Sequence, residues 1–556
     1  MTCPRGAEHP SPFFFFFFLL TSLLASPDIF SRRISIKMST AASAPAHDHD
    51  ERLERDKARL KVYSEGHSEG LDRKLRSFHI TMIGFSSGIG TGLFIGTGSA
   101  YASAGPAGLC LAYCIVGTVL WCVMQSIGEL ATLVPTAGSF PHWATRFIDP
   151  SVGFSLAISY GYCYSIAIAS EVSAAAVLVS YWTDVSPVLV ITLGLAAILA
   201  LNLTSVEFFG HSEVIAGSIK VLCFIGLTIV AVVITSGGGP NGSSSGFQYW
   251  NNPGPWTQYN DIAGSTGRFV GVLSALVNAS FSFIGIETVV ITAAESINPH
   301  RDIPRAAKRV TYRIAFFYIL SVLLIGLIVD PRNPSLVSGT GNANSSPWVI
   351  AIQAAGIKVL PSVVNACILI SAWSAGNSYC WVGSRIILSM AADRQLPAVF
   401  ARTWRNGVPW VAVLGQGGPS QAFSWLLNLS TVAGLITWTV LCLCYIRFNA
   451  ALRRQGRLCN PMPLGSGGAT ILTFISGFSI FLKGDWVTSN FIASYVGIPV
   501  FIISTLGWKT IKRSKFVHTR DADLWSGRLE MHEAQQIQKA ASEPISASGR
   551  VSRWLL

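Results

Sequence analysis

The chain has 556 residues, of which half are hydrophobic and only 12% are charged, and its formal net charge is +12. Soluble domains carry about 25% charged residues, so this composition excludes an ordinary soluble protein and indicates a polytopic membrane protein. The basic residues cluster in short loops between apolar runs, as in cytoplasmic loops of membrane proteins, and therefore do not indicate nucleic-acid binding. The 11 cysteines show no CxxC or Cys/His ligand spacing. We predict no metal site and no cofactor. No nucleotide-binding glycine-rich loop after a strand and no HExxH motif is present, which argues against an ATP-driven pump or a metal-dependent hydrolase, and we expect no enzyme.

The first residues contain an apolar run, Phe13 to Phe18 followed by two leucines, that resembles a signal peptide. However, the polar stretch that follows ends in Arg73-Lys74-Leu75-Arg76 directly before the first apolar span, and basic residues at that place hold a segment in the cytoplasm. We therefore expect residues 1–37 to be an extension introduced by the gene model, or disordered. Residues 38–78 are expected to form a disordered cytoplasmic tail.

Apolar runs near the roughly 20 residues that a bilayer requires fill residues 79–508, which we predict to be one transmembrane domain. Eleven spans are evident, at 79–103, 108–133, 154–180, 186–206, 214–235, 270–295, 312–330, 361–390, 424–448, 467–483 and 489–508. Two basic loops, at 394–405 and 453–457, should both be cytoplasmic, yet only one span separates them. We therefore expect twelve spans, with the ninth truncated near residue 414, and a cytoplasmic C-terminal tail over residues 509–556.

The first span carries the sequence Ser86-Ser87-Gly88-Ile89-Gly90-Thr91-Gly92 in its middle. Glycine costs roughly 1 kcal/mol per residue in a helix interior relative to alanine, so three glycines in five residues predict two half-helices. Unpaired backbone groups are tolerated at membrane depth only where they line a cavity or are buried in protein. Broken helices that face a small ligand are typical of secondary transporters. The alternative is that these glycines only let two helices pack closely.

Eight motifs follow one another along residues 70–515: GIGTGLF at 88–94, SAGPAGL at 103–109, GELAT at 128–132, AGSF at 137–140, GGGPN at 237–241, FSFIGIE at 281–287, NP…IPRAAKRV at 298–310 and SAWSAGNS at 371–378. This series resembles the fungal amino-acid permeases, the yeast amino acid transporter family of the amino acid–polyamine–organocation superfamily. The resemblance implies an all-α, LeuT-like fold of two inverted five-helix repeats followed by two C-terminal helices. It also implies import of amino acids with protons across the plasma membrane, by a multi-pass protein with both termini in the cytoplasm.

The sequence departs from that family in three places. Ser86-Ser87-Gly88 stands where the family usually has Gly-Gly-Ser/Thr, the ninth helix is largely absent, and the segment 457–468 is shortened. Three alternatives to a transporter therefore stay open: a non-transporting amino-acid sensor of the same fold, a passive pore, and an inactive product of a misread gene. The expected partners are an amino-acid substrate and the lipid bilayer. The oligomeric state is left open.

A free amino acid is a zwitterion, and a site for it needs donors for the carboxylate and acceptors for the ammonium. The half-helix after Gly90 offers backbone N–H groups and the positive end of a dipole. The FSFIGIE motif resembles a partner break whose carbonyls suit the ammonium, with Phe283 closing over the substrate. Glu171 matches a family glutamate on the substrate side, although a structural hydrogen bond is the alternative. The predicted substrate-binding residues are Ser87, Gly88, Ile89, Gly90, Thr91, Gly92, Glu171, Ser282, Phe283, Gly285, Ser374, Asn377 and Ser430.

Ionisable residues inside a membrane are costly and usually functional. Lys220 matches a lysine position that related transporters link to proton coupling, with a lysine that snorkels to the interface as the alternative. We read Glu287, which follows the second break, as proton-linked. Glu129 and Glu295 lie near predicted cytoplasmic ends, and we expect them to pair with basic loop residues in gating.

Overall fold

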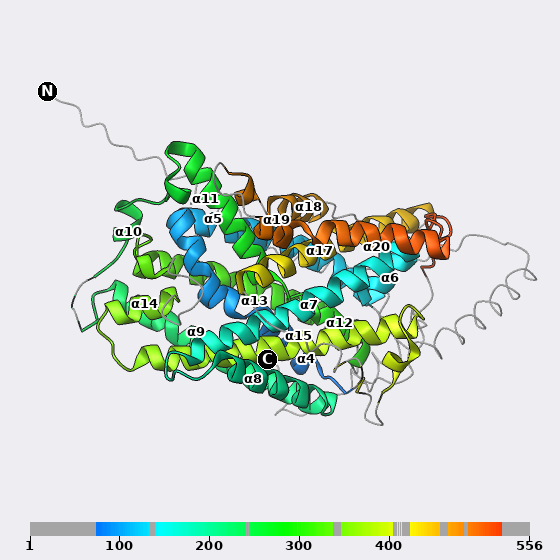
Figure 1. The fold of residues 1–556 in the computed structure, drawn as a ribbon, viewed down its shortest axis with the longest axis horizontal. Coiled ribbons are helices and arrows are strands. Elements are labelled where there is room, and N and C mark those ends of the chain that lie inside the picture. Colours follow the sequence, from blue (N-terminus) through cyan, green and yellow to red (C-terminus); the bar gives the residue numbers. More distant parts are fainter. Residues whose placement is uncertain are drawn as a thin grey trace, which may run out of the picture. The chain divides into compact units, whose positions relative to one another are not determined.

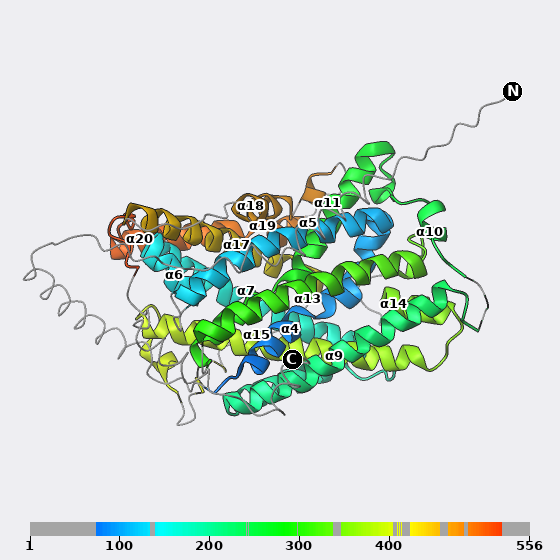
Figure 2. The ribbon, with the colours of Figure 1, turned by 180° about the vertical axis from the view of Figure 1, so that it is seen from behind.

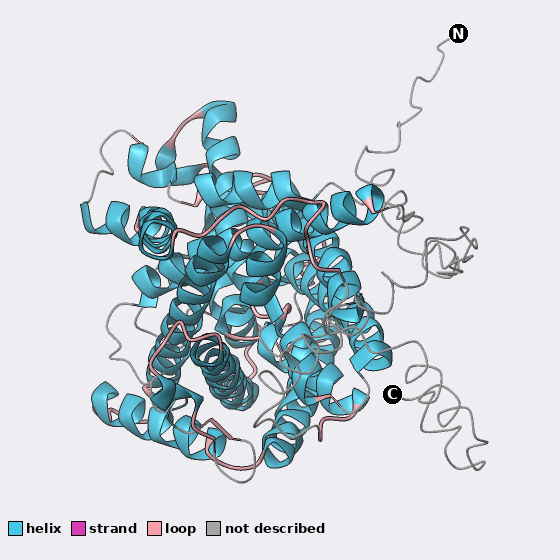
Figure 3. Ribbon diagram, turned by 90° about the vertical axis from the view of Figure 1, so that its right-hand side faces the viewer, coloured by secondary structure: helices cyan, strands magenta, loops and turns pink. Residues whose placement is uncertain are grey.

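The computed structural model describes residues 74–524, except for residues 134–138, 241, 243, 297–298, 337–345, 404–407, 410, 412, 414–422, 456–464, 477 and 483–487. Two units, residues 1–59 and 60–556, divide the chain, and every described residue belongs to the second. The secondary structure of this part is helical, without a β-strand among the described residues (Figure 3). The expectations for residues 1–73 and for the tail beyond residue 524 lie outside the described residues.

The first half of the described chain forms seven main helical elements (Figure 1). They are α4 (Ser77–Gly88), η1 (Gly92–Gly96), α5 (Thr97–Leu133), α6 (Ser139–Phe147), α7 (Pro150–Val179), α8 (Pro187–Asn202) and α9 (Val206–Thr235). Helix α5 consists of two helices that meet at Gly105, which has a φ of 74° and is followed by Pro106. This kink lies between the first two predicted spans.

The second half begins after a loop region with two short elements, α10 (Gln248–Asn251) and η2 (Tyr259–Asp261). The main elements are then α11 (Gly264–Phe283), α12 (Thr288–Ile291), η3 (Thr292–Glu295), α13 (Pro299–Ile328), η4 (Pro334–Leu336), α14 (Pro347–Ala354), α15 (Leu360–Ala392), η6 (Ala398–Ala401), α17 (Phe423–Arg454), α18 (Gly465–Ile475), η7 (Phe478–Phe481), α19 (Thr488–Tyr495) and α20 (Gly497–Lys512).

Several of these helices are long and apolar enough to cross a membrane, which confirms a multi-pass membrane protein. Six segments meet that criterion within the described residues: Ser77–Ala131, Pro150–Val179, Val206–Thr235, Gly264–Ile291, Arg301–Ile328 and Leu429–Arg454. Two helices begin before the spans predicted from the sequence. Helix α13 begins at Pro299, so most of the stretch between the predicted spans 270–295 and 312–330 is helical, and α9 begins at Val206, ahead of the predicted span 214–235. The truncated ninth span falls mainly on residues outside the described ones.

The interrupted segments lie in the middle of the packing. Helix α4 packs against α9, α12, α13 and α15, and Figure 2 shows it among α9, α13 and α15. Its residues from His79 to Gly88 are buried except Met82. By contrast, α8 exposes apolar side chains such as Val188 and Leu193, at 70% and 62% of their surface. Such a surface suits contact with lipid. The core therefore surrounds the two segments that the sequence predicts to be broken.

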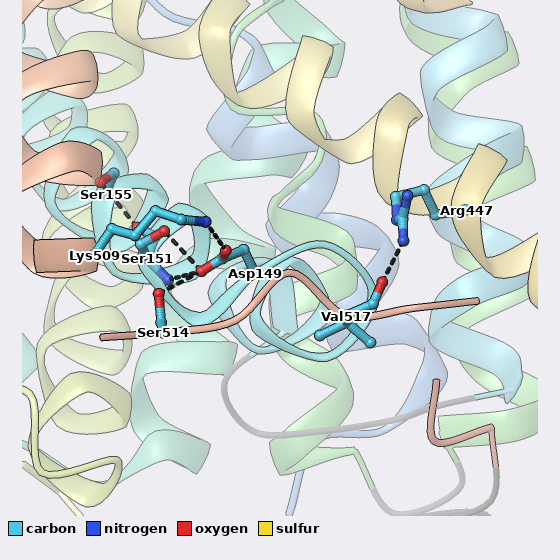
Figure 4. Close-up of polar contacts among 7 residues, drawn as sticks. All are labelled: Asp149, Ser151, Ser155, Arg447, Lys509, Ser514 and Val517. Carbon is cyan, nitrogen blue, oxygen red and sulfur yellow. Dashed lines mark hydrogen bonds and ion pairs between the residues drawn. The ribbon is translucent and has the colours of Figure 1, made fainter. Parts of the chain in front are cut away.

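The corner between α6 and α7 is held by Asp149, the N-cap of α7. Its carboxylate accepts hydrogen bonds from the backbone N–H and hydroxyl of Ser151 at 2.8 and 2.7 Å and from the Ser514 hydroxyl at 2.7 Å, and it forms an ion pair with Lys509 of α20 (Figure 4). Burial alone raises the pKa of Asp149, but these hydrogen bonds outweigh it and lower the pKa to about 2. The end of α20 is therefore attached to the start of α7.

The residues that follow α20, Arg513–Leu524, run back against the same corner, and we call them the C-terminal segment. The N–H of Val517 donates to the carbonyl of Ile148 at 2.9 Å, while the carbonyl of Val517 accepts a hydrogen bond from Arg447 of α17 (Figure 4). The guanidinium of Arg447 lies 4.1 Å from the ring centroid of Phe516. Part of the predicted C-terminal tail is thus packed against the helices.

Candidate functional site

The first break occurs where the glycine pattern predicts it. Helix α4 ends at Gly88, Ile89 is extended with φ −95° and ψ 96°, and helical geometry resumes at Thr91 with φ −65° and ψ −22°. The turn that follows, Gly92–Gly96, is a π-helix, a form that occurs often at functional sites. The prediction of an interrupted first span is confirmed. The glycines also allow close packing, because a Cβ at Gly88 would lie 2.8 Å from the Ile286 side chain.

Lys220 of α9 supplies the partner for the carbonyls that this break frees. Its Nζ donates to the carbonyl oxygens of Ser86 and Ile89 at 2.5 and 2.8 Å, and the Ser371 hydroxyl of α15 donates to Ile89 at 3.0 Å. Only 1% of Lys220 is exposed. The ammonium therefore points inward onto the negative end of α4, and the alternative of a lysine that snorkels to the interface is wrong.

The second break lies between α11 and α12. Helix α11 ends at Phe283, Ile284 is extended with φ −67° and ψ 141°, and Gly285 has a φ of 103°, a region that favours glycine. The Ser87 hydroxyl lies 3.0 Å from the carbonyl oxygen of Gly285 and 2.7 Å from the Thr288 hydroxyl. The two breaks therefore touch one another through their backbone and hydroxyl groups.

Tyr318 of α13 links the same two breaks. Its hydroxyl lies within hydrogen-bond distance of the Gly88 carbonyl and, at 2.8 Å, of the Ser282 carbonyl. A phenol has one proton to donate, so it can bond fully to only one of the two at a time. The rings of Phe283 and Tyr318 pack with centroids 4.6 Å apart, and Tyr113 pairs with the Ser282 hydroxyl at 2.9 Å. Phe283 is thus held between aromatic neighbours, and its closing over a substrate stays a prediction.

Glu171 of α7 lies at the start of the helix that follows the first break. Both of its carboxylate oxygens lie 3.3 Å from the N–H of Thr91, and the side chain is 1% exposed. A carboxylate at a helix N-terminus is stabilised by the free N–H groups and the dipole. The protein's own carboxylate therefore occupies the position that the sequence predicts for the carboxylate of the substrate.

Glu287 lies at the second break with tyrosines of α7. Its Oε1 accepts hydrogen bonds from the hydroxyls of Tyr160 and Tyr164 at 2.9 and 3.4 Å, and its Oε2 accepts one from the N–H of Gly285 at 3.2 Å. Glu287 is fully buried. The geometry connects it to the break, as expected from its position, whereas its link to protons stays a prediction.

A second buried carboxylate lies beside the first break, and the sequence reasoning missed it. Glu213 of α9 accepts hydrogen bonds from the Ser374 hydroxyl at 2.9 Å and from the Asn377 amide at 2.6 Å, and Asn202 donates to Asn377 at 2.7 Å. The hydroxyl of Ser374 also lies 2.6 Å from that of Ser86. Ser374 therefore contacts the first break directly, whereas Asn377 reaches it only through Glu213.

The remaining predicted residues lie farther from the breaks. Glu295 forms a buried ion pair with Arg385 at 2.9 Å, so one of its partners is a basic residue of helix α15. Glu129 accepts a hydrogen bond from the Tyr445 hydroxyl at 2.6 Å. Ser430 is buried, and its carbonyl accepts from Cys163 of α7 at 3.2 Å. Gating by the two glutamates and a pocket role for Ser430 stay predictions. Among the described residues no group of three His, Cys, Asp or Glu could hold a metal ion.

Comparison with known proteins supports the family resemblance that the sequence motifs indicate. A family model described as amino acid permease matches residues 79–520. The chain is 39% identical over 489 residues to a proline-specific permease of Emericella nidulans, covering 83% of this chain and 89% of the relative. It is 33% identical to the dicarboxylic amino acid permease of Saccharomyces cerevisiae, covering 95% and 91%, and 35% identical to the general amino-acid permease of that yeast, covering 87% and 85%.

A solved structure shares the fold. The crystal structure of a mutant manganese transporter from Eremococcus coleocola superposes with a TM-score of 0.52 at 16% sequence identity, covering 81% of this chain and 98% of that one. At this level of identity the likeness concerns the fold alone.

Proposed function

This chain belongs to the fungal amino acid permeases of the amino acid–polyamine–organocation superfamily, and from that premise we propose that it imports amino acids together with protons across the plasma membrane. Members of the family are transporters rather than enzymes, and the chain is a multi-pass membrane protein. Beyond family membership, the proposal specifies import as the direction of transport, the proton as the coupling ion and the plasma membrane as the location. It also adds a LeuT-like arrangement of two inverted repeats with twelve spans. Breaks in the first and sixth predicted spans are expected of such an arrangement.

The observation that carries the proposal is the meeting of two interrupted helices in the buried centre of the molecule. Ser87 reaches Gly285, and Tyr318 reaches the carbonyls on both sides. Irregular backbone at membrane depth is tolerated only where it is buried or lines a cavity. The dipoles that end there can bind both charges of a zwitterion: N–H groups the carboxylate, and carbonyl groups the ammonium.

Glu171 gives the proposal a specific exchange of partners. Its carboxylate accepts a hydrogen bond from the N–H of Thr91. Two carboxylates cannot share one donor closely without strong repulsion. We therefore propose that the substrate carboxylate takes over the N–H of Thr91 and that Glu171 turns to the substrate ammonium. In this exchange the single contact between Glu171 and the Thr91 N–H gives way to two contacts: Thr91 N–H with the substrate carboxylate, and Glu171 with the substrate ammonium.

Proton coupling is proposed to run through Lys220, which holds the carbonyls of Ser86 and Ile89. Loss of its proton would turn two charge-assisted hydrogen bonds, each worth about 1.5–3 kcal/mol, into weaker neutral ones at the end of α4. The inner half-helix would then be free to shift against α9. Loss or gain of the Lys220 proton is in this way linked to the movement of α4 against α9 that we propose for alternating access. Lys220, Glu171 and Glu287 are the ionisable groups that we propose to act at the breaks, with Glu129 and Glu295 as gating residues.

The test is uptake of labelled amino acids by permease-deficient yeast cells at several external pH values. The panel should include proline, dicarboxylic and basic amino acids, because relatives with these names have similar identities to this chain. We expect uptake of at least one amino acid that rises as the external pH falls and that a protonophore abolishes. Uptake without any pH dependence would refute proton coupling. No uptake by a protein present at the surface would favour the sensor or the inactive product, and a version with a restored ninth helix would distinguish these two.

A further inference from the structure

Helix α13 begins with a basic stretch that takes no part in the two breaks. We propose that its side chains Arg305, Arg309 and Arg313, which we call the arginine strip, bind the headgroup of one anionic phospholipid. An acyl chain of the same lipid lies on Phe316 and Leu320, one and two turns deeper in the membrane. Binding of this lipid is separate from the proposed transport and can be measured without it.

The first reason is that these side chains form one exposed line along α13. Arg305, Arg309 and Arg313 are exposed, as is Phe316, whereas the residue directly after each arginine is buried. Residues four positions apart follow one another on the same face of a helix, about 6 Å apart along its axis. A planar guanidinium can bond to two oxygens of one phosphate group. The strip therefore offers three such donors in a row.

The second reason is the depth at which the arginine strip lies in a membrane. Helix α13 has 30 residues, which correspond to about 45 Å of helix, whereas the hydrocarbon core of a bilayer is about 30 Å thick. Asp330, which forms an ion pair just beyond the last turn of α13, marks one side of the membrane. Roughly 20 residues back from Ile328, the helix reaches the opposite boundary at Arg309. Arg305 then lies at the level of the headgroups, and Arg313 reaches back to it because long basic side chains extend toward the interface.

The third reason is an excess of positive charge at this end of α13. Five basic residues and one acidic residue, Asp302, give Pro299–Arg313 a net charge of +4. Asp302 interacts electrostatically with Arg305, whereas Arg309 and Arg313 act on one another as like charges. Like charges four residues apart destabilise a helix, and an anionic headgroup offsets that repulsion. The basic end is predicted to face the cytoplasm, where the membrane leaflet contains anionic lipids.

The aromatic side chains below the strip explain why the ligand is a lipid. Phe316 is 62% exposed, and its ring lies 5.8 Å from that of Phe317. Phe317 in turn packs on Phe85 of α4 and Phe224 of α9, with ring centroids 5.4 and 4.6 Å apart. The surface offered to an acyl chain is thus backed by three helices. A soluble polyanion such as an acidic peptide gains nothing from an aromatic ring at the depth of the hydrocarbon.

The experiment counts the lipids bound to the purified chain by native mass spectrometry. Phosphatidylserine and phosphatidylcholine with the same acyl chains are titrated in turn. One basic residue near an anionic surface contributes about fivefold to binding, so we expect phosphatidylserine to bind at least about tenfold more tightly. The combined variant Arg305→Gln, Arg309→Gln and Arg313→Gln should lose this preference. Phe316→Ala should weaken both lipids alike, and unchanged binding of both would overturn its part in the site.

The matched control combines Arg453→Gln, Arg454→Gln and Lys515→Gln, which removes the same charge from exposed positions elsewhere, and it should keep the preference. Equal affinity of the unmodified protein for both lipids would overturn the proposal, and so would a preference that survives in the strip variant. An equal loss in both combined variants would overturn it in favour of general attraction, and displacement of phosphatidylserine by polyglutamate in favour of a soluble polyanion. Should the strip variant not fold, Arg309→Gln decides: about fivefold weaker binding of phosphatidylserine supports the proposal, and unchanged binding overturns it.

Discussion

The contact between the two breaks predicts a severe effect of a single methyl group at Gly285. A Cβ at this position would lie 2.9 Å from the carbonyl oxygen of Ser87 and 3.1 Å from the ring of Tyr379. The φ of 103° is in addition a conformation that residues other than glycine rarely adopt. Gly285→Ala therefore combines backbone strain with a clash against the main chain of the other break, which cannot rotate away.

The magnitude follows from these two effects. A residue in such a strained conformation costs about 1–3 kcal/mol, and overpacking of a tight core costs about 1–3 kcal/mol. We expect a total loss of about 2–6 kcal/mol. Where the loss falls on the transport cycle, 1.4 kcal/mol corresponds to a factor of about ten in rate, so uptake should decrease by at least that factor.

The assay compares Gly285→Ala with Gly226→Ala, a matched control on α9 where an added Cβ meets nothing within 4 Å. Thermal stability of the solubilised protein and uptake per molecule at the surface should both fall for Gly285→Ala. Gly226→Ala should keep uptake and gain up to about 1 kcal/mol of stability, because alanine favours a helix. Full stability and uptake of Gly285→Ala would refute the close contact of the two breaks.

Further predictions concern the links around the breaks and at the corner of α7. Tyr318→Phe should reduce uptake at an unchanged surface level, because the Gly88 and Ser282 carbonyls lose their shared donor; uptake like that of the unmodified protein would contradict this. Lys220→Met should lose the pH dependence of uptake, and a normal pH profile would contradict its role. Arg385→Met should lower the free energy of unfolding by about 3–5 kcal/mol because it removes the arginine from a buried ion pair with Glu295, and a second change, Glu295→Met, should restore most of the loss. Asp149→Asn should be less stable than the unmodified protein by about 2 kcal/mol at neutral pH. Because the pKa of Asp149 is lowered to about 2, this difference in stability should be fully present above about pH 4 and should vanish as the pH falls toward 2. Thermal unfolding at a series of pH values would measure it.

The backbone features of the site could be predicted from the sequence because they depend on local chemistry. Three glycines between Gly88 and Gly92 indicate a break by helix propensity alone. Gly285 could be found only through the resemblance, because one glycine in an apolar run is compatible with a continuous helix. Lys220 was recognised as an ionisable residue in an apolar span, and its partners follow from the carbonyls that the break frees.

The tertiary partners could not be predicted from the sequence. A tyrosine such as Tyr318 within an apolar helix gives no signal of what its hydroxyl reaches. Glu213 was missed because the predicted fifth span began at residue 214, one position too late, which placed this glutamate in a loop. The spacing of seven residues to Lys220 was the signal that could have found it, since residues two turns apart share a face of a helix.

The C-terminal segment bears on how reporters can be attached to this protein. Val517 provides an acceptor for Arg447, and Ser514 provides a donor for Asp149. A fluorescent fusion that replaces everything after Lys512 would remove both, and would leave a guanidinium and a carboxylate short of partners at the corner of α7. A fusion joined after Leu524 keeps these bonds, so differences between two tagged versions would reflect the place of the junction rather than the tag.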